Sequence, residues 1–180
     1  VRHYSVAKED QTNRDSLAVI YLPARVPKKQ SGTRAQDMEL ALKDLDEYVS
    51  GQLGDKVLER QTDSDELSLT VHRDNIIETL KFLRDDVNCQ FKQVMDICGV
   101  DYPENEERFC VVYNLLSLPH NLRIRIKTWT SEDVPVPSAT GLFSAANWWE
   151  REAWDLYGIY FTDHPDLRRI LTDYGFEGHP

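Results

Sequence analysis

The sequence has few cysteines, no long apolar run and a shortage of positive charge, and each of these excludes a class of protein. Its 180 residues include three cysteines, Cys89, Cys98 and Cys110, an odd number that does not suit a disulfide framework. No pair of them has the C-x-x-C spacing that zinc or iron–sulfur ligation usually requires. We therefore interpret them as small buried hydrophobic residues of a protein from a reducing compartment.

The longest apolar stretch covers residues 17–22, which is far below the ~20 residues that a membrane-spanning helix needs. Lys and Arg total 21 and Asp and Glu total 31, so the net charge is −10. A surface this acidic repels phosphate backbones and anionic lipid headgroups, which argues against nucleic-acid binding and against electrostatic membrane binding. The sequence also has no G-x-G-x-x-G or P-loop motif, so nothing in it supports nucleotide binding.

What is present is the pattern of a globular protein, with 41% hydrophobic and 29% charged residues. Apolar residues at steps of three and four predict helices over residues 34–53 and 75–87. Alternation of apolar and polar residues predicts strands over 56–61, 66–72, 90–97, 108–116 and 121–130. This order indicates an α+β fold, a two-layer domain with a mostly antiparallel sheet and two helices on one face.

The chain divides into three segments. Residues 1–33 are weakly patterned and are predicted to form an extended arm with one short strand near residues 17–22, ahead of the α+β domain over 34–130. Residues 131–180 hold a third helix, predicted over 140–157, and then an extended tail. Because that tail is long for a structureless segment of a compact domain, it points to a function or to a partner.

The third predicted helix mixes apolar and charged residues in an unusual way. One apolar stripe is formed by Leu142, Ala145, Trp149, Ala153 and Leu156. Outside this stripe lie Trp148, Trp154 and Tyr157, and the same helix carries Glu150, Arg151, Glu152 and Asp155. An ordinary surface helix separates the two classes, so the mixture predicts burial on two sides with each charge paired.

The expected cations for these acids follow the helix, at Arg168 and Arg169. Arginine forms bidentate pairs with carboxylates and suits buried or interface positions better than lysine does. Arg151 and Asp155 can also pair within the helix, at a spacing of four residues. Two interpretations stay open here. The charges form an internal network that holds the tail on its own domain, or they form part of a partner interface, where Trp and Arg are enriched.

The acids and histidines of this region also admit an interpretation as a hydrolytic metal site. Its members would be Glu150, Glu152, Asp155, His164 and His179. Glu152 and Asp155 lie one helical turn apart, but no tightly spaced histidine motif such as H-E-x-x-H accompanies them. Structural pairing is therefore favoured, and a stand-alone metallohydrolase using Glu152, Asp155 and His164 is kept as the alternative from a different class.

Two long segments closely resemble the signature of a known family, the 30-kDa subunit of proton-pumping NADH:quinone oxidoreductase, respiratory complex I. They are Trp149–Ile159 and Phe161–Leu171, with shorter family-like segments at 99–103, 112–117 and 121–125. The resemblance covers about residues 65 to 180, and an ordered signature of this length is far more specific than a short motif.

The resemblance implies a non-redox structural subunit of the peripheral arm. Such a subunit supports the 49-kDa-type quinone-site subunit while electrons pass from NADH to ubiquinone and protons are pumped. It implies no catalytic residue, metal or cofactor in this chain, with FMN and Fe–S clusters in partner subunits that include the small Fe–S subunit. It also implies a place on the peripheral-arm side of the energy-coupling membrane, either the matrix side of the mitochondrial inner membrane or the cytoplasmic face of a bacterial plasma membrane.

The residues expected at the interface with these partners lie on the third helix and at the start of the tail. They are Trp148, Trp149, Glu150, Arg151, Glu152, Trp154, Asp155, Tyr157, His164, Pro165, Arg168 and Arg169. A second interpretation within the same resemblance is the equivalent subunit of a related membrane-bound hydrogenase complex.

Overall fold

The computed structural model describes residues 34–63 and 66–180, so the arm predicted over 1–33 lies outside the described residues. Its helices are α1 (Arg34–Leu53), α2 (Ile76–Asp85) and α3 (Ala146–Tyr157). Its strands are β1 (Val57–Asp63), β2 (Glu66–Val71), β3 (Gln93–Asp101), β4 (Phe109–Ser117), β5 (Leu122–Thr130), β6 (Val136–Pro137) and β7 (Phe161–Thr162). Within the described ranges, no helix is long and apolar enough to span a bilayer.

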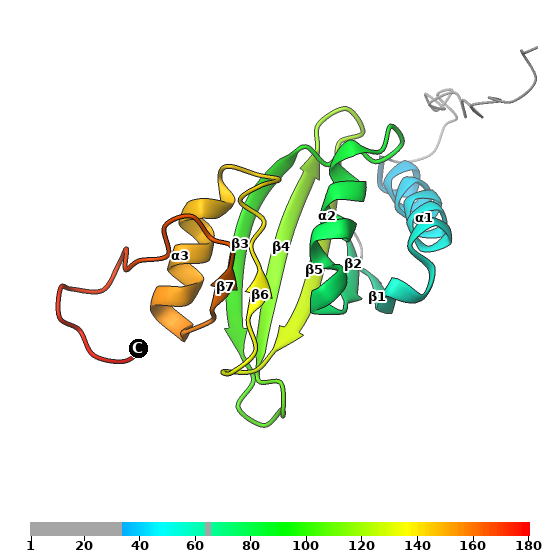
Figure 1. Ribbon diagram of the computed structural model, residues 1–180. Helices are drawn as coiled ribbons and strands as arrows, with labels where there is room; N and C mark the ends of the chain where they lie inside the picture. The colour runs from blue at the N-terminus through cyan, green and yellow to red at the C-terminus, as the bar shows by residue number, and fades with distance from the viewer. Residues whose placement is uncertain (1–33, 64–65) are drawn as a thin grey trace, which may run out of the picture. The chain divides into compact units, whose positions relative to one another are not determined.

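Five strands form one sheet in the order β1-β2-β5-β4-β3 (Figure 1). The pairs β1–β2, β5–β4 and β4–β3 are antiparallel, and β2 pairs with β5 in parallel. The parallel pair arises because the chain runs through α2, β3 and β4 before β5 returns beside β2. The predicted α+β fold with a mostly antiparallel sheet is confirmed.

The alternation in β5 shows why these residues form a sheet with one buried face. Leu122, Ile124 and Ile126 are buried in the hydrophobic core. The residues between them, including Arg123 and Arg125, point to the opposite face, because successive side chains of a strand alternate in direction. The burial of these three apolar side chains determines which face of β5 points into the core.

The first helix has the bounds that the sequence predicts, and its apolar stripe is buried. The stripe consists of Leu42, Leu45, Val49 and Leu53. α1 meets α2 through Tyr48, whose ring stacks on Phe82 with 6.4 Å between ring centroids. The Tyr48 hydroxyl donates a hydrogen bond of 3.1 Å to the Asp86 carboxylate just after α2. The two helices therefore belong to one core.

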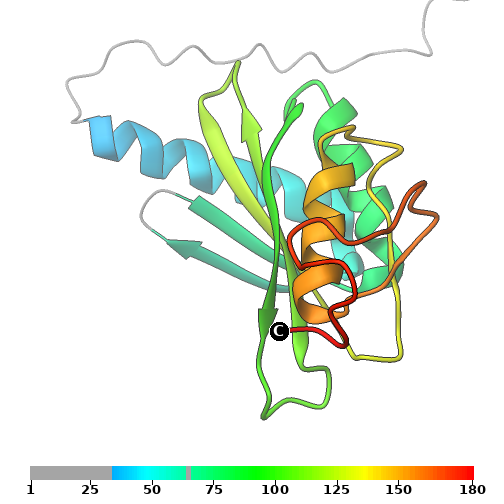
Figure 2. The same cartoon turned by 90° about the vertical axis from the view of Figure 1, so that its left-hand side faces the viewer.

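The third helix lies against β3, the strand at one edge of the sheet, and Figure 2 shows α2 and α3 on the same side of the sheet. Gly99 of β3 permits a close approach there. A Cβ atom at Gly99 would lie 3.0 Å from both Tyr157 and Ile159, tighter than ordinary contact. α3 and the chain that follows it are thus fixed to the edge strand by packing.

Several predicted boundaries are wrong. α3 begins at Ala146 instead of 140, because the backbone turns at Ala139, whose carbonyl accepts the N–H groups of both Leu142 and Phe143 at 2.9 Å. β3 starts after the predicted position, because Gln90 has φ 48° and breaks the strand direction. α2 ends at Asp85 instead of 87.

A small parallel pair, β6 with β7, was not predicted from the sequence. It joins Val136 to Phe161 and Pro137 to Thr162. The Ser138 N–H extends the pairing with a 3.0 Å hydrogen bond to the carbonyl of Thr162. This pair binds the segments before and after α3 to each other, so both ends of the helix are held and the tail leaves from a fixed point.

Candidate functional site

The predicted interface residues lie on α3 and on the tail that follows it. The helix ends where the sequence predicts, at Gly158, which has φ 77° and donates its N–H to the carbonyl of Trp154 at 2.9 Å. Glycine suits this left-handed position because it has no Cβ. The tail then turns back along the helix and supplies the partners of Asp155, whereas the partners of Glu150 lie ahead of the helix.

Glu150 points from α3 into the core and is fully buried. Its two carboxylate oxygens accept one hydrogen bond each, from the Ser138 hydroxyl and from the N–H of Ala139, both at 2.6 Å. Among the described residues it forms no ion pair. Burial disfavours its charged form and outweighs these two hydrogen bonds, so its pKa is raised from 4.5 to about 7.

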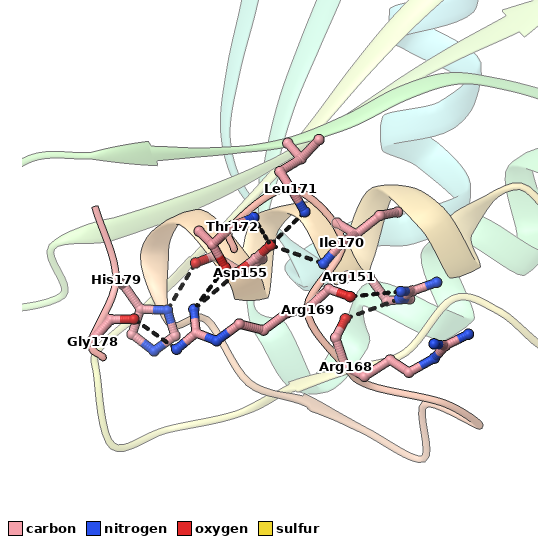
Figure 3. A network of polar contacts seen from close by, with 9 residues as sticks. All are labelled: Arg151, Asp155, Arg168, Arg169, Ile170, Leu171, Thr172, Gly178 and His179. Atoms are coloured by element: carbon pink, nitrogen blue, oxygen red, sulfur yellow. Dashed lines mark hydrogen bonds and ion pairs between the residues drawn. The ribbon is translucent and has the colours of Figure 1, made fainter. Parts of the chain in front are cut away.

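Asp155, near the other end of α3, is also fully buried but has many more donors (Figure 3). One carboxylate oxygen accepts the successive N–H groups of Ile170, Leu171 and Thr172, at 2.9, 2.7 and 3.0 Å. The other accepts the Thr172 hydroxyl at 2.6 Å and an Arg169 N–H at 2.9 Å. Burial alone would raise the pKa of Asp155, but these hydrogen bonds prevail and hold it well below its usual range.

Arg169 connects the Asp155 carboxylate to the end of the tail. Beyond Asp155, its guanidinium donates to the carbonyl of Gly178 at 2.8 Å. It also lies over two aromatic rings, 5.6 Å from the ring centroid of Trp154 and 5.7 Å from that of Phe176. The planar guanidinium thus bridges α3 and two points of the tail, which a lysine ammonium could not do in the same geometry.

Arg151 and His179 bind backbone carbonyls rather than acids. Arg151 donates to the carbonyls of Arg168 and Arg169 at 3.0 and 2.8 Å, and its guanidinium lies 5.9 Å from the ring centroid of Trp148. His179 Nδ1 lies 3.0 Å from the carbonyl oxygen of Asp155. The ion pair predicted between Arg151 and Asp155 is therefore wrong, because the tail backbone takes up the guanidinium instead.

The remaining predicted residues have mixed surroundings. Trp148 is 67% exposed, and Arg168, 68% exposed along its side chain, pairs with Asp166 at 2.8 Å. His164 bridges the carbonyl of Asn147 and the N–H of Asp166, at 3.0 and 3.1 Å. Pro165 is exposed, whereas the half-buried residues of this set are Trp149, Glu152, Trp154 and Tyr157. For Asp155, Arg151 and Arg169, the interpretation as an internal network matches the contacts.

The metal-site alternative finds no support in this geometry. Within residues 34–63 and 66–180, no group of three His, Cys, Asp or Glu side chains could hold a metal ion. Both oxygens of Asp155 are taken by hydrogen-bond donors, and both ring nitrogens of His164 have backbone partners. A metal on Asp155 would have to displace the amides that hold the tail.

Sequence reasoning missed two features of this region. It did not find Ser138, Ala139 and Thr172 as partners of the acids, and no local signal identifies them. It also passed over a group of exposed apolar residues, namely Tyr160, Leu171, Tyr174 and Phe176. Aromatic residues in an aperiodic tail were the available signal for these, because a tail without periodicity buries them poorly in its own domain.

Residues 69–180 match the family model of the respiratory-chain NADH dehydrogenase 30-kDa subunit. The chain is 57% identical over 144 residues to the C subunit of NADH-quinone oxidoreductase from Paramagnetospirillum magneticum, covering 79% of this chain and 72% of that protein. It is also 57% identical to the corresponding protein of Rhodospirillum rubrum, over 77% of this chain and 65% of the relative.

The fold resembles a chain in the structure of the membrane-bound sulfane sulfur reductase, an archaeal respiratory membrane complex. The TM-score is 0.63, and the match covers 73% of this chain and 78% of that one. The two are 22% identical, so this likeness concerns the fold alone.

Proposed function

The chain belongs to the family of the 30-kDa subunit of respiratory-chain NADH dehydrogenase, and from this membership we propose that it is a structural, non-redox subunit of that enzyme's peripheral arm. In this role it supports the quinone-site subunit of the 49-kDa type and contacts the small Fe–S subunit. NADH oxidation, electron transfer to ubiquinone and proton pumping take place in other chains, which hold the FMN and the Fe–S clusters.

The observation that carries the proposal is the concentration of exposed apolar side chains on α3 and the tail. These side chains, which we call the apolar patch, are the exposed large apolar residues of the segment 148–176, namely Trp148, Tyr160, Leu171, Tyr174 and Phe176. A gathering of exposed aromatic residues on a folded domain marks a protein interface, and Trp and Tyr are the residues that contribute most to binding energy there. The patch therefore supports docking to another subunit.

The cysteines support a role without a redox centre in this chain. All three are free thiols, and burial raises the pKa of each, to about 11 for Cys110. A thiol with a raised pKa stays protonated and binds metal poorly, because the thiolate is the ligand. This chemistry supports the proposal that the Fe–S clusters lie in partner chains.

The proposed location is the membrane face that carries the peripheral arm. In a mitochondrion this is the matrix side of the inner membrane, and in a bacterium it is the cytoplasmic face of the plasma membrane. The subunit is attached there through its partners, which agrees with the acidic charge of the chain, because such a surface is repelled by anionic lipid.

The test replaces apolar residues of the patch in the full enzyme. We expect the double variant Leu171→Ser/Tyr174→Ser to reduce the amount of assembled complex about tenfold, measured on native gels, because two anchors are lost. NADH:quinone activity per assembled complex should stay unchanged. A control is Leu58→Ser/Val87→Ser, which alters two exposed apolar residues that lie outside α3 and the tail and should assemble normally.

Two outcomes would contradict the proposal. If activity per complex disappears while assembly is intact, the chain has a catalytic role. If the control reduces the amount of assembled complex as much as the patch variant does, the loss is not specific to the patch, and the patch is not the interface. Assays of the purified complex distinguish complex I from a membrane-bound hydrogenase. Bound FMN together with NADH oxidation supports complex I, and H₂ evolution supports a hydrogenase.

A further inference from the structure

Asp155 occupies a position that its own helix disfavours. It lies in the last turn of α3, where the helix dipole presents its negative end and a carboxylate is unfavourable. It is also fully buried, which further penalises its charge. A charged residue persists in such a place only if other groups compensate for both penalties, and here these groups all come from the tail.

The compensation has the form of an anion nest. Three successive backbone N–H groups, from Ile170 to Thr172, converge on one carboxylate oxygen of Asp155 (Figure 3). Successive amides point at one anion only when the backbone is folded into a concave turn around it. The carboxylate therefore specifies the conformation of the tail at these residues, in addition to holding it in place.

Further contacts pin the tail on both sides of the nest. Ahead of it, Arg151 binds the carbonyls of Arg168 and Arg169. Beyond it, Arg169 binds the carbonyl of Gly178, and His179 Nδ1 lies 3.0 Å from the carbonyl oxygen of Asp155. Residues 170–178 thus form a loop that is closed at both ends against the last two turns of α3.

Three members of the apolar patch lie in this loop, namely Leu171, Tyr174 and Phe176. Phe176 is the inner one of the three, because its ring packs on the Arg169 guanidinium. The backbone N–H of Leu171 is bound by Asp155 directly, and Tyr174 follows two residues after the last bound amide, that of Thr172. The loop combines an internally bonded backbone with exposed apolar side chains, which is the arrangement of a preformed binding element.

We propose that Asp155 preforms the loop 170–178 in the free chain, so that an apolar surface of the partner subunit meets Leu171, Tyr174 and Phe176 already in position. The docking part of this proposal rests on the proposed function, whereas the preformation does not. Fixing a segment before association removes the entropic cost of ordering it on binding, and this makes a short loop an effective anchor. Asp155 is accordingly a positioning residue and need not touch the partner.

The first test is amide hydrogen exchange on the full chain alone. We expect the Ile170, Leu171 and Thr172 amides to exchange at least ~100-fold more slowly than in an unstructured peptide, because they are hydrogen-bonded to a buried acceptor. Asp155→Asn should remove most of this protection. The asparagine side chain has no charge, and its NH₂ group would face N–H groups that need an acceptor. Asp173→Asn, an exposed acid of the same loop, is the matched control and should change nothing.

A milder variant keeps the test decisive if Asp155→Asn disturbs α3. Thr172→Val removes the hydroxyl bond to Asp155 and the 3.2 Å bond that the hydroxyl accepts from Arg169, and it leaves the three amides in place. It should speed exchange of these amides about fivefold, because the bond to the Asp155 carboxylate is lost. Amides of β4 and β5, followed in the same experiment, report whether the domain remains folded.

Two results would overturn the preformation, and a third would overturn its role in docking. Exchange at peptide rates in the unmodified chain would show that the loop is not preformed. Equal protection in the chain and in Asp155→Asn would show that Asp155 does not organise it. If Asp155→Asn loses protection yet assembles into the enzyme like the unmodified chain, docking does not use the preformed loop, whatever the fate of the proposed function.

Discussion

The two acids of α3 that have no exposed surface lie on one helix, yet their pKa values move in opposite directions. Glu150 has a hydroxyl and one amide as donors, and burial prevails. Asp155 has three amides, a hydroxyl and a guanidinium, and the hydrogen bonds prevail. The comparison indicates that burial raises the pKa of a carboxylate unless enough donors are aimed at it to outweigh that cost.

The difference also separates the two roles of α3. The half with Glu150 faces the domain to which the helix belongs and binds Ser138 and Ala139 just after β6. The half with Asp155 binds the tail that carries much of the apolar patch. The comparison predicts that changes at Glu150 affect the stability of the domain, whereas changes around Asp155 affect the tail.

The largest expected effect is that of Glu150→Ala. It leaves the Ala139 N–H and the Ser138 hydroxyl without an acceptor and opens a cavity in the core, so we expect the free energy of unfolding to fall by about 3 kcal/mol. Urea unfolding followed by circular dichroism measures this. Glu152→Ala, a half-buried acid on the same helix, is the control and should be close to neutral. Equal losses for both variants would contradict the assigned role of Glu150.

The second prediction concerns the pH dependence of stability, which should differ in sign between Glu150 and Asp155. Glu150 has a pKa of about 7 in the folded chain and 4.5 as its ordinary value, so its neutral form is favoured by folding. Its contribution to stability is therefore fully present below pH 4.5 and is lost as the pH rises through 7, by at most about 3 kcal/mol. Asp155 has the opposite sign, because its lowered pKa contributes stability that is lost as the pH falls below its ordinary value of 3.8.

Unfolding measured between pH 5 and 8 tests the Glu150 part of this prediction. Glu150→Gln keeps the size of the side chain and does not titrate, so the decline in stability toward pH 8 should flatten in this variant. An unchanged slope would mean that another group causes the decline.

The smallest expected effect comes from replacing Arg169 and is measured against its neighbour Arg168. It tests the role of the part of α3 that holds Asp155. Arg169→Ala should lower the free energy of opening the tail by about 2 kcal/mol, because the guanidinium bonds to Asp155 and Gly178 are lost. Arg168→Ala should have no measurable effect, because its ion pair with Asp166 is exposed. Thermolysin cleavage at the exposed Leu171 and Phe176 reports the opening. Similar cleavage rates in both variants would show that the network does not hold the tail.

Much of the fold could be predicted because helices and strands leave a periodic record in the sequence. α1 has the bounds that its apolar spacing predicts, and β5 buries the side of its alternation that was expected to be inside. The start of α3 could not be predicted in the same way. Leu142 and Ala145 continue the apolar spacing of the helix, but the carbonyl of Ala139 accepts the N–H groups of Leu142 and Phe143 and the backbone forms turns over 140–145.

The site was predictable in its chemistry and not in its partners. Buried charges require compensation, and the prediction that Arg169 pairs with Asp155 is confirmed. The same prediction is wrong for Arg168, which pairs with Asp166, and for Glu150, which has no ion pair among the described residues. The sequence could not indicate that Arg151 would bind carbonyls, or that backbone N–H groups would be donors to Asp155 and Glu150. Every residue other than proline carries the same N–H group, so its use at a site leaves no mark in the sequence.

Apolar periodicity was enough to predict the α+β class, the signature segments indicated the family, and the composition of residues 146–157 revealed an unusual charged and aromatic helix. Which of the two acids keeps its charge, and that the tail closes on Asp155, became known from the contacts of the folded chain. Periodicity and composition are properties of local sequence, whereas the charge of a buried group depends on donors that distant segments bring to within about 3 Å of it.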